Sequence, residues 1–302
     1  MKITTYFLLV TSMLLSIASA HAESSFQLAK VATWNMKWLG TNSGNQLDET
    51  ENVPKYAEVI RSTDAHLFAL QEIGATHSVN GMPRCYYLDL IVAELNKTTR
   101  HKWAYKLDAT NKNQRLAYLY NKNVWSLSDA ESVWPGSSYR SARRPFVVKA
   151  TLNSNQFDMS LINVHFKAFP DEKSSKKRAE NIRELSVWIS ENDSLDEDTL
   201  LVGDTNIYPT DGDIELPLRS AGLIPLDDDE KTAIHKGKLS QRFDRFYISM
   251  GLRHEFNAAA VAFGRGIVVD VIKKDSQGYL DNFDSKISDH FPVVLGLATG
   301  TE

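Results

Sequence analysis

The sequence has 302 residues, of which 42% are hydrophobic and 24% are charged, and its formal net charge is −4. A protein that binds nucleic acid through its overall charge is basic, so an anionic ligand here must meet a local basic patch or a bound metal. The single cysteine, Cys85, excludes an internal disulfide, and we expect it to be a small buried apolar side chain.

Residues 1–22 have the pattern of a secretory signal peptide. Lys2 supplies a positive charge, residues 6–20 form an apolar run, and Ala20-His21-Ala22 is a small-x-small cleavage site. The run is shorter than a membrane span requires. We expect cleavage after Ala22, with an uncleaved anchor as the alternative. The mature protein is then secreted or periplasmic, and soluble.

Hydrophobic periodicity predicts an alternation of strands and helices in the remaining chain. In chain order these are a strand over 30–36, a helix over 54–62, a strand over 66–73, a helix over 86–97, strands over 102–107, 115–121, 146–152 and 157–166, a helix over 174–192, and strands over 199–206, 242–249, 266–272 and 291–297. Long polar loops are expected at 39–53 and 226–240. Neither a repeat nor a linker divides residues 23–302, so we expect one domain of packed sheets with flanking helices.

Polar side chains recur where the predicted strands end. They are Asn35, Glu72, Asn163, His165, Asp204, Asn206, Asp244, Asp289 and His290. Each alone has a structural explanation, because Asn and Asp begin turns and a histidine near a strand is more often structural. Together, carboxylates and amides without thiolates suit Mg²⁺, Mn²⁺ or Ca²⁺ rather than zinc. Two histidines with spare carboxylates at Asp108 and Asp244 suit acid–base chemistry on a phosphate ester.

Eight motifs resemble, in order, those of the endonuclease/exonuclease/phosphatase superfamily, which includes deoxyribonuclease I. They are TWNMKWLG (33–40), LQEIG (70–74), RLAYLYN (115–121), RRPFVV (143–148), INVHFKA (162–168), GDTN (203–206), RFDRF (242–246) and SDHFPV (288–293). The resemblance implies an α/β fold, a four-layer α/β sandwich of two packed mixed β-sheets flanked by helices. The sequence departs from the family at Thr205, where an aromatic residue is usual. It also lacks the paired cysteines of many secreted deoxyribonucleases.

The resemblance also implies a metal site and an orienting pair. Glu72 matches the metal-binding glutamate, Asn35 lies beside it, and Asp289 matches a carboxylate at or near the metal. The implied cofactor is Mg²⁺, with Mn²⁺ or Ca²⁺ as alternatives. Asp204 and Asn206 match the residues that orient the attacking water and the scissile phosphate.

Two histidines complete the implied catalytic set. His290 matches the catalytic histidine, and Asp244 matches the aspartate that orients it. His165 matches a second histidine, which leans on a carboxylate from an earlier strand in the deoxyribonuclease branch. Asp108 is our candidate for that carboxylate, although its spacing to Arg115 is shorter than in the family.

The substrate must be inferred from residues outside the catalytic core. The candidate substrate-binding residues are Arg115, Arg140, Arg143, Arg144 and Lys167, and the basic residues Lys173, Lys176, Lys177 and Arg178 either join them or face solvent. A sphingomyelinase presents an exposed apolar hairpin to the membrane, and apart from a small segment at 133–139 none is evident.

We therefore expect a secreted, divalent-metal-dependent nuclease that hydrolyses phosphodiester bonds, with DNA favoured over RNA. It is expected to be a monomer without stable membrane association. One alternative is a phosphatase or phosphodiesterase of the same fold that acts on a phospholipid or an inositol or sugar phosphate. The other is a non-catalytic binding or toxin-accessory module.

Overall fold

The computed structural model describes residues 27–42, 45–46, 50–74, 76–98, 100–110, 114–128, 130–140, 143–193, 195–226, 231–254, 267–268 and 283–299. The predicted signal peptide lies outside these residues and stays a prediction. Most of the strand predicted over 266–272 also lies outside them.

The first sheet is mixed and has β1 near its centre. Its strand order is β18 (Ile267–Val268), β19 (Val293–Thr299), β1 (Gln27–Leu39), β4 (Leu67–Ile73), β8 (Arg115–Asn121) and β7 (Trp103–Leu107). β1 runs antiparallel to β19 and parallel to β4. Alternate residues of β1 point to opposite faces, as expected of a strand: Trp34 packs toward the helices and Val31 toward the second sheet.

The second sheet is also mixed, with one parallel pair at its centre. Its order is β10 (Glu131–Ser132), β11 (Phe146–Leu152), β12 (Asp158–His165), β13 (Thr199–Asp204), β17 (Asp244–Ile248) and β14 (Ile224–Pro225), and β9 (Trp125–Leu127) pairs with β11. β12 and β13 are parallel, whereas β13 and β17 are antiparallel. This pairing brings the C-terminal ends of β12 and β13 and the N-terminal end of β17 to the same end of the sheet.

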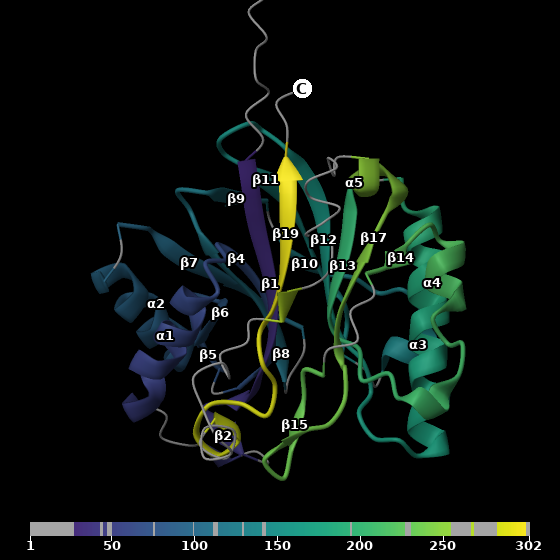
Figure 1. The fold of residues 1–302 in the computed structure, drawn as a ribbon, viewed down its shortest axis with the longest axis horizontal. Helices are drawn as coiled ribbons and strands as arrows, with labels where there is room; N and C mark the ends of the chain where they lie inside the picture. The colour runs from purple at the N-terminus through teal and green to yellow at the C-terminus, as the bar shows by residue number, and fades with distance from the viewer. Residues whose placement is uncertain are drawn as a thin grey trace, which may run out of the picture.

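Helices cover the outer face of each sheet, which gives the four layers that the family resemblance implied (Figure 1). α1 (Val53–Ser62) and α2 (Tyr86–Thr98) pack on the first sheet, and α3 (Glu172–Glu191) and α4 (Leu216–Ser220) pack on the second. A third apolar cluster fills the space between the sheets. No helix in the described part of the chain is long and apolar enough to cross a membrane.

Short elements occupy the connections, including the two segments expected to be loops. They are the hairpins β2 (Thr41–Asn42) with β3 (Asn45–Gln46), β5 (Thr76–Val79) with β6 (Met82–Cys85), and β15 (Ile234–His235) with β16 (Lys238–Leu239), the 3-10 turns η1 (Thr50–Asn52), η2 (Ser137–Arg140) and η3 (Pro209–Asp211), and α5 (Met250–His254).

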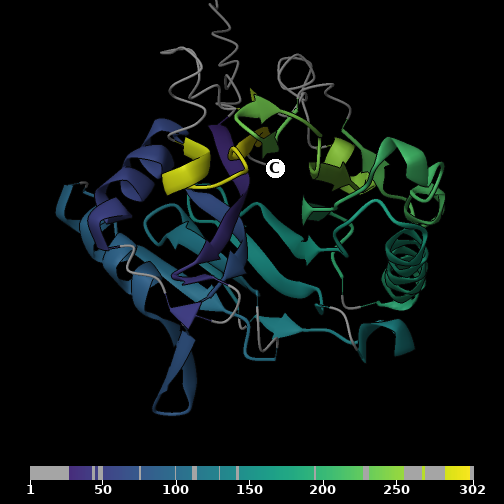
Figure 2. The ribbon, with the colours of Figure 1, turned by 90° about the horizontal axis from the view of Figure 1, so that it is seen from below.

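The β5–β6 hairpin was not expected from the sequence, and it exposes two apolar side chains among polar ones. It extends away from the body of the molecule (Figure 2). Val79 is 45% exposed and Met82 is 64% exposed near its tip. Asn80 and Gly81 form the turn with φ of 52° and 79°, as a two-residue hairpin turn requires.

Candidate active site

The ends of three strands in the second sheet place their polar side chains in one row. On the parallel pair, His165 of β12 lies opposite Asp204 of β13. On the antiparallel pair, the same Asp204 lies opposite Asp244 of β17. All three are the terminal residues of their strands and are buried. The register of the sheet therefore assembles this half of the site.

Two β-bulges in the first sheet turn Asn35 and Glu72 toward that row. The pairing of β1 with β4 shifts register after Asn35, and the pairing of β4 with β8 shifts before Ile73. Glu72 itself has φ 59°, a conformation that few side chains adopt. The backbone N–H of Trp38 donates to Glu72 Oε2 (3.1 Å). Bulges commonly re-aim a side chain beside a functional site.

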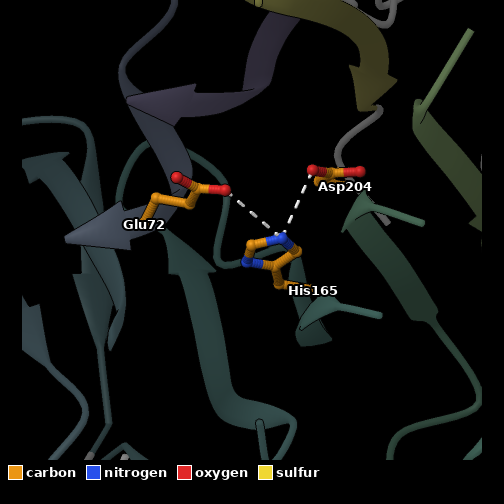
Figure 3. Close-up of side chains that lie close together, drawn as sticks. All are labelled: Glu72, His165 and Asp204. Atoms are coloured by element: carbon orange, nitrogen blue, oxygen red, sulfur yellow. Dashed lines mark ion pairs between the residues drawn. The ribbon is translucent and has the colours of Figure 1, made fainter. Parts of the chain in front are cut away.

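Glu72, His165 and Asp204 converge on a single point (Figure 3). His165 Nε2 lies 3.6 Å from Glu72 Oε1 and 3.4 Å from Asp204 Oδ2. One ligand atom from each residue lies within 4.8 Å of the others. The amide of Asn35 links the two carboxylates, because its Nδ2 donates to Glu72 Oε1 (3.2 Å) and to Asp204 Oδ2 (2.8 Å).

The charge balance of this cluster favours a bound cation. Burial raises the pKa of Glu72. Burial, aided by the nearby charges of Asp244 and Glu72, also raises the pKa of Asp204, to about 7. Burial disfavours charged carboxylates, and His290 and Arg143 offset this only in part, so the cluster lacks a full counter-charge. A divalent cation would supply it, and the two carboxylates are the oxygen donors that Mg²⁺ and Mn²⁺ accept.

Asp289 is not part of this convergence, although the resemblance implied a metal role for it. Its side chain is half-buried, and its carbonyl accepts from the backbone N–H of Ile234 (2.6 Å). Its charge still acts on the site, because it raises the pKa of both Glu72 and His290. Among the described residues, His165 completes the set of three converging ligand atoms instead.

His290 and Asp244 form the buried pair that the resemblance implied. His290 Nδ1 lies 2.7 Å from Asp244 Oδ2, and the hydroxyl of Thr232 donates to the same oxygen (2.6 Å). Burial alone lowers the pKa of His290, but the charges of Asp244, Asp204 and Asp289 outweigh it and raise the pKa to about 10. His290 is therefore an imidazolium at neutral pH.

The predicted pairing of His165 with Asp108 is not present. His165 Nδ1 is buried and has no hydrogen-bond partner. The Asp108 carboxylate instead accepts from the backbone and hydroxyl of Thr110 (2.8 and 3.0 Å) and from Ser132. Burial, with Arg143 and His290 nearby, lowers the pKa of His165 well below its ordinary value. The two histidines thus have opposite charge states.

Arg143 lies at the site, but its guanidinium is used internally. Its Nε donates to the carbonyl of His165 (2.9 Å) and its Nη2 to the carbonyl of Phe166 (2.5 Å), and Nη1 donates to Gln114. It therefore fixes the end of β12. Its charge lowers the pKa of Glu72.

The other predicted substrate-binding residues are dispersed. Arg115 donates to the carbonyl of Asp108 (2.6 Å) and to Thr76 (3.1 Å), and so fixes the base of the β5–β6 hairpin. Arg144 stacks over the ring of Trp134, 4.0 Å from its centroid. Arg140 on η2 and Lys167 after β12 are exposed.

Asn206, the predicted partner of Asp204 in orienting the water and the phosphate, is buried, and its backbone N–H donates to Asp204 Oδ1 (3.0 Å).

Several residues support the site without having been predicted from the sequence. Ser288 Oγ donates to the carbonyl of Asn35 (2.6 Å) and accepts from the N–H of His290 (3.1 Å). Trp34 Nε1 donates to the carbonyl of His290 (2.8 Å). Both fasten the segment before β19 to β1. Their presence in the motifs TWN and SDH was the only signal, and it did not indicate their function.

Asn163 and Arg178 were candidates for a functional role, but both have structural roles. Asn163 is fully buried between the sheets, where its amide accepts from Gln71 Nε2 (2.8 Å) and donates to the carbonyl of Leu70 (3.0 Å). Arg178 was expected on the exposed basic face of its helix, yet its side chain is 0% exposed and pairs with Asp211.

Known proteins resemble this one in structure and not in sequence. No protein-family model matches the sequence, and no curated protein matches it significantly. An endonuclease/exonuclease/phosphatase family protein from Bacteroides thetaiotaomicron matches the structure with a TM-score of 0.61 and 16% identity, over 91% of this chain and 98% of that one. The chain has the endonuclease/exonuclease/phosphatase fold.

Proteins with different activities share this fold. A mannosyl-6-phosphatase from the same bacterium matches with a TM-score of 0.57 and 16% identity, over 90% of this chain and 99% of that one. A 3′-5′ exonuclease from Neisseria meningitidis matches with a TM-score of 0.59 and 16% identity, over 90% of this chain and 100% of that one. The fold alone therefore leaves the substrate open.

Proposed function

We propose that this protein is a divalent-metal-dependent hydrolase that cleaves phosphodiester bonds in nucleic acid, with DNA favoured over RNA. The observation that carries the proposal is the convergence of Glu72, His165 and Asp204 beside the His290–Asp244 pair. A non-catalytic module has no need of buried carboxylates whose charge is only partly compensated, because such groups destabilise the fold.

The residues divide into those that hold the cation and those that handle protons. Glu72 and Asp204, which the Asn35 amide bridges through its Nδ2, would hold Mg²⁺ or Mn²⁺, which supplies Lewis acidity toward a phosphoryl oxygen and lowers the pKa of water. His290, charged through Asp244, carries a proton that it can donate to a phosphate oxygen. Neutral His165 can accept one. Opposite pKa shifts on neighbouring titratable groups are the usual mark of an acid and a base.

Two pairs of a cationic and an aromatic side chain support nucleic acid as the substrate, and the charge of Lys167 in one of them acts on His165. Lys167 lies over the ring of Phe169, 4.6 Å from its centroid, and Arg144 lies over Trp134. Such pairs offer a positive charge for a phosphate and a ring for a base. A sugar monophosphate needs the cation but not the ring.

We also propose that residues 1–22 are removed on export and that the mature chain acts as a monomer outside the cytoplasm. Amino-terminal sequencing of the exported protein should begin at Glu23. Size-exclusion chromatography with light scattering should give one chain per particle. An intact amino terminus in the mature protein contradicts the first statement, and a dimer contradicts the second.

The proposed activity can be tested with purified residues 23–302. The substrates are single-stranded DNA, duplex DNA, RNA, a sugar monophosphate, an inositol phosphate and sphingomyelin vesicles, each with Mg²⁺, Mn²⁺, Ca²⁺ or EDTA. We expect cleavage of DNA that EDTA abolishes and that Mg²⁺ or Mn²⁺ restores. Glu72→Gln should lower the rate by orders of magnitude, whereas Glu58→Gln, an exposed control on α1, should not.

Two results overturn parts of this proposal separately. Full activity in EDTA removes the metal from the account. Hydrolysis of the sugar monophosphate without any cleavage of nucleic acid replaces the nuclease with a phosphatase. The sphingomyelin vesicles are included because the β5–β6 hairpin exposes Val79 and Met82.

A further inference from the structure

An exposed aromatic side chain lies on the loop that leaves the active site. Phe169 follows His165 by four residues and is 60% exposed. Its φ is 84°, a region that a bulky side chain rarely occupies. Residues held in such conformations persist only where the surrounding structure enforces them, and they cluster at ligand-binding sites.

Arg178 anchors the main chain on both sides of this position. Its Nη1 donates to the carbonyls of Lys167 (2.7 Å) and Phe169 (2.8 Å). The rest of its guanidinium forms two bonds with the carboxylate of Asp211, at 2.9 and 2.6 Å. Because Asp211 lies on the loop after β13, Arg178 fixes the two active-site loops to each other. The ring of Phe169 is thus presented from a rigid support.

A short row of rings leads from the catalytic histidine to the loop after β13, beside this support. The ring of His290 lies 6.1 Å from that of Phe243, which lies 4.8 Å from that of Tyr208. Burial raises the pKa of the Tyr208 hydroxyl, and a backbone hydrogen bond from Phe169 opposes part of that rise. The main chain of Phe169 therefore adjoins the outer ring of a row that begins at the reacting centre.

We propose that Phe169 and Lys167 form a subsite that holds an unpaired nucleobase next to the bond to be cut. The base stacks on the ring of Phe169, and the ammonium of Lys167 meets the adjoining phosphate. The inference rests on the proposed nuclease function and narrows its substrate. Stacking requires an open base face, which a duplex hides except at its ends. The preferred substrate is therefore a single strand or an unpaired end.

The contribution of one stacked base sets the expected effect. Replacing a stacking aromatic residue by alanine weakens single-strand binding by about 5- to 150-fold per base. We expect Phe169→Ala to raise KM for single-stranded DNA within that range and to change kcat less. Phe169→Trp should retain the wild-type KM, whereas Phe169→Leu, which has no aromatic face, should resemble Phe169→Ala. Val187→Ala, at an exposed apolar position on α3, is the control.

A scan with abasic nucleotides tests the contact itself. In a set of single-stranded oligonucleotides, one tetrahydrofuran abasic unit occupies each position in turn, and cleavage at every bond is read on a sequencing gel. For the wild type, the abasic unit should suppress cleavage of a bond at a fixed offset from it. In Phe169→Ala that local suppression should disappear. The variant has no aromatic ring at this position for a base to stack on, so removal of the base no longer changes cleavage.

The outcomes separate this inference from the function on which it rests. If the wild type cleaves the oligonucleotides but Phe169→Ala shows the same abasic profile, the subsite is refuted and the nuclease stands. If duplex DNA with blunt ends is cleaved as readily as single strands, the preference for unpaired bases is refuted. If no nucleic acid is cleaved while a sugar monophosphate is, the proposed function itself fails.

Discussion

The buried ion pair between Arg178 and Asp211 should make a large contribution to stability, and its size can be measured. Both side chains are at most 1% exposed. Arg178 donates two bonds to the carboxylate and two to main-chain carbonyls. Removing one partner of a buried pair typically costs about 3–5 kcal/mol, because the other charge stays buried without compensation. We expect Arg178→Ala to lower the free energy of unfolding by that amount.

The same helix provides a matched control. Lys176 pairs with Glu172 one turn away at 2.6 Å, but these side chains are 72% and 82% exposed. Exposed pairs of this kind contribute at most about 0.5 kcal/mol, so Lys176→Ala should have little effect. Urea unfolding followed by circular dichroism gives both values, provided that the slope of the transition does not change.

A double variant examines the cause of the effect. Arg178→Met with Asp211→Leu removes both charges and keeps most of the buried volume. It should lose less stability than the sum of the two single variants, since no charge is left unpaired. The reasoning is refuted if Arg178→Ala loses less than about 1 kcal/mol, or if the double variant loses the full sum.

Three other results are expected. The pKa of Asp211 is lowered, because Arg178 and other hydrogen-bond donors outweigh its burial. The stabilising effect of the charged Asp211 is therefore complete above the ordinary pKa of 3.8 and is lost as the pH falls through the lower folded value. Asp211→Asn should thus unfold with a weaker pH dependence in acid, and an unchanged acid-unfolding curve contradicts this. His290→Ala should lower kcat by about 10²- to 10⁴-fold, and Asp244→Asn should lower it by less. Near-normal activity of His165→Ala would make His165 a structural residue. Cys85 is fully buried and burial raises its pKa to about 11, so a thiol reagent should label it only in the unfolded protein, and labelling of the native chain refutes that burial.

The sequence predicted the layers of this fold because strand and helix patterns depend on local periodicity. The helices predicted over 54–62, 86–97 and 174–192 are observed at Val53–Ser62, Tyr86–Thr98 and Glu172–Glu191. The last begins earlier than predicted because Asp171 caps it by accepting from the N–H of Ser174 (3.0 Å). The β5–β6 hairpin was missed although Asn80-Gly81 is a strong hairpin signal; its strands are too short to show clear alternation.

The candidate site was predictable where residue type and strand register coincide. Asp204 and His165 end neighbouring parallel strands, so their motifs were sufficient to bring them together. Charged residues outside the strands were not predictable in this way. Arg143 and Arg178 looked like ligands for a polyanion, but each satisfies main-chain carbonyls at the end of β12 or in the loop after it. Whether a guanidinium binds its own chain or a ligand depends on where loops fold, and sequence spacing does not contain that information.

The pairing of β1 with β19 determines when the catalytic set is completed. Gln27 lies opposite Thr299, so the first and last strands of the described chain are neighbours (Figure 1). Asn35 and Glu72 are synthesised early, whereas His290 comes immediately before β19. A partial chain that ends between residues 204 and 290 contains both carboxylates of the cluster but lacks His290. The adjacency also permits circular permutation: a loop joining Thr299 to Gln27, with new ends at Asn80 and Gly81, would retain all the strand pairs of the first sheet.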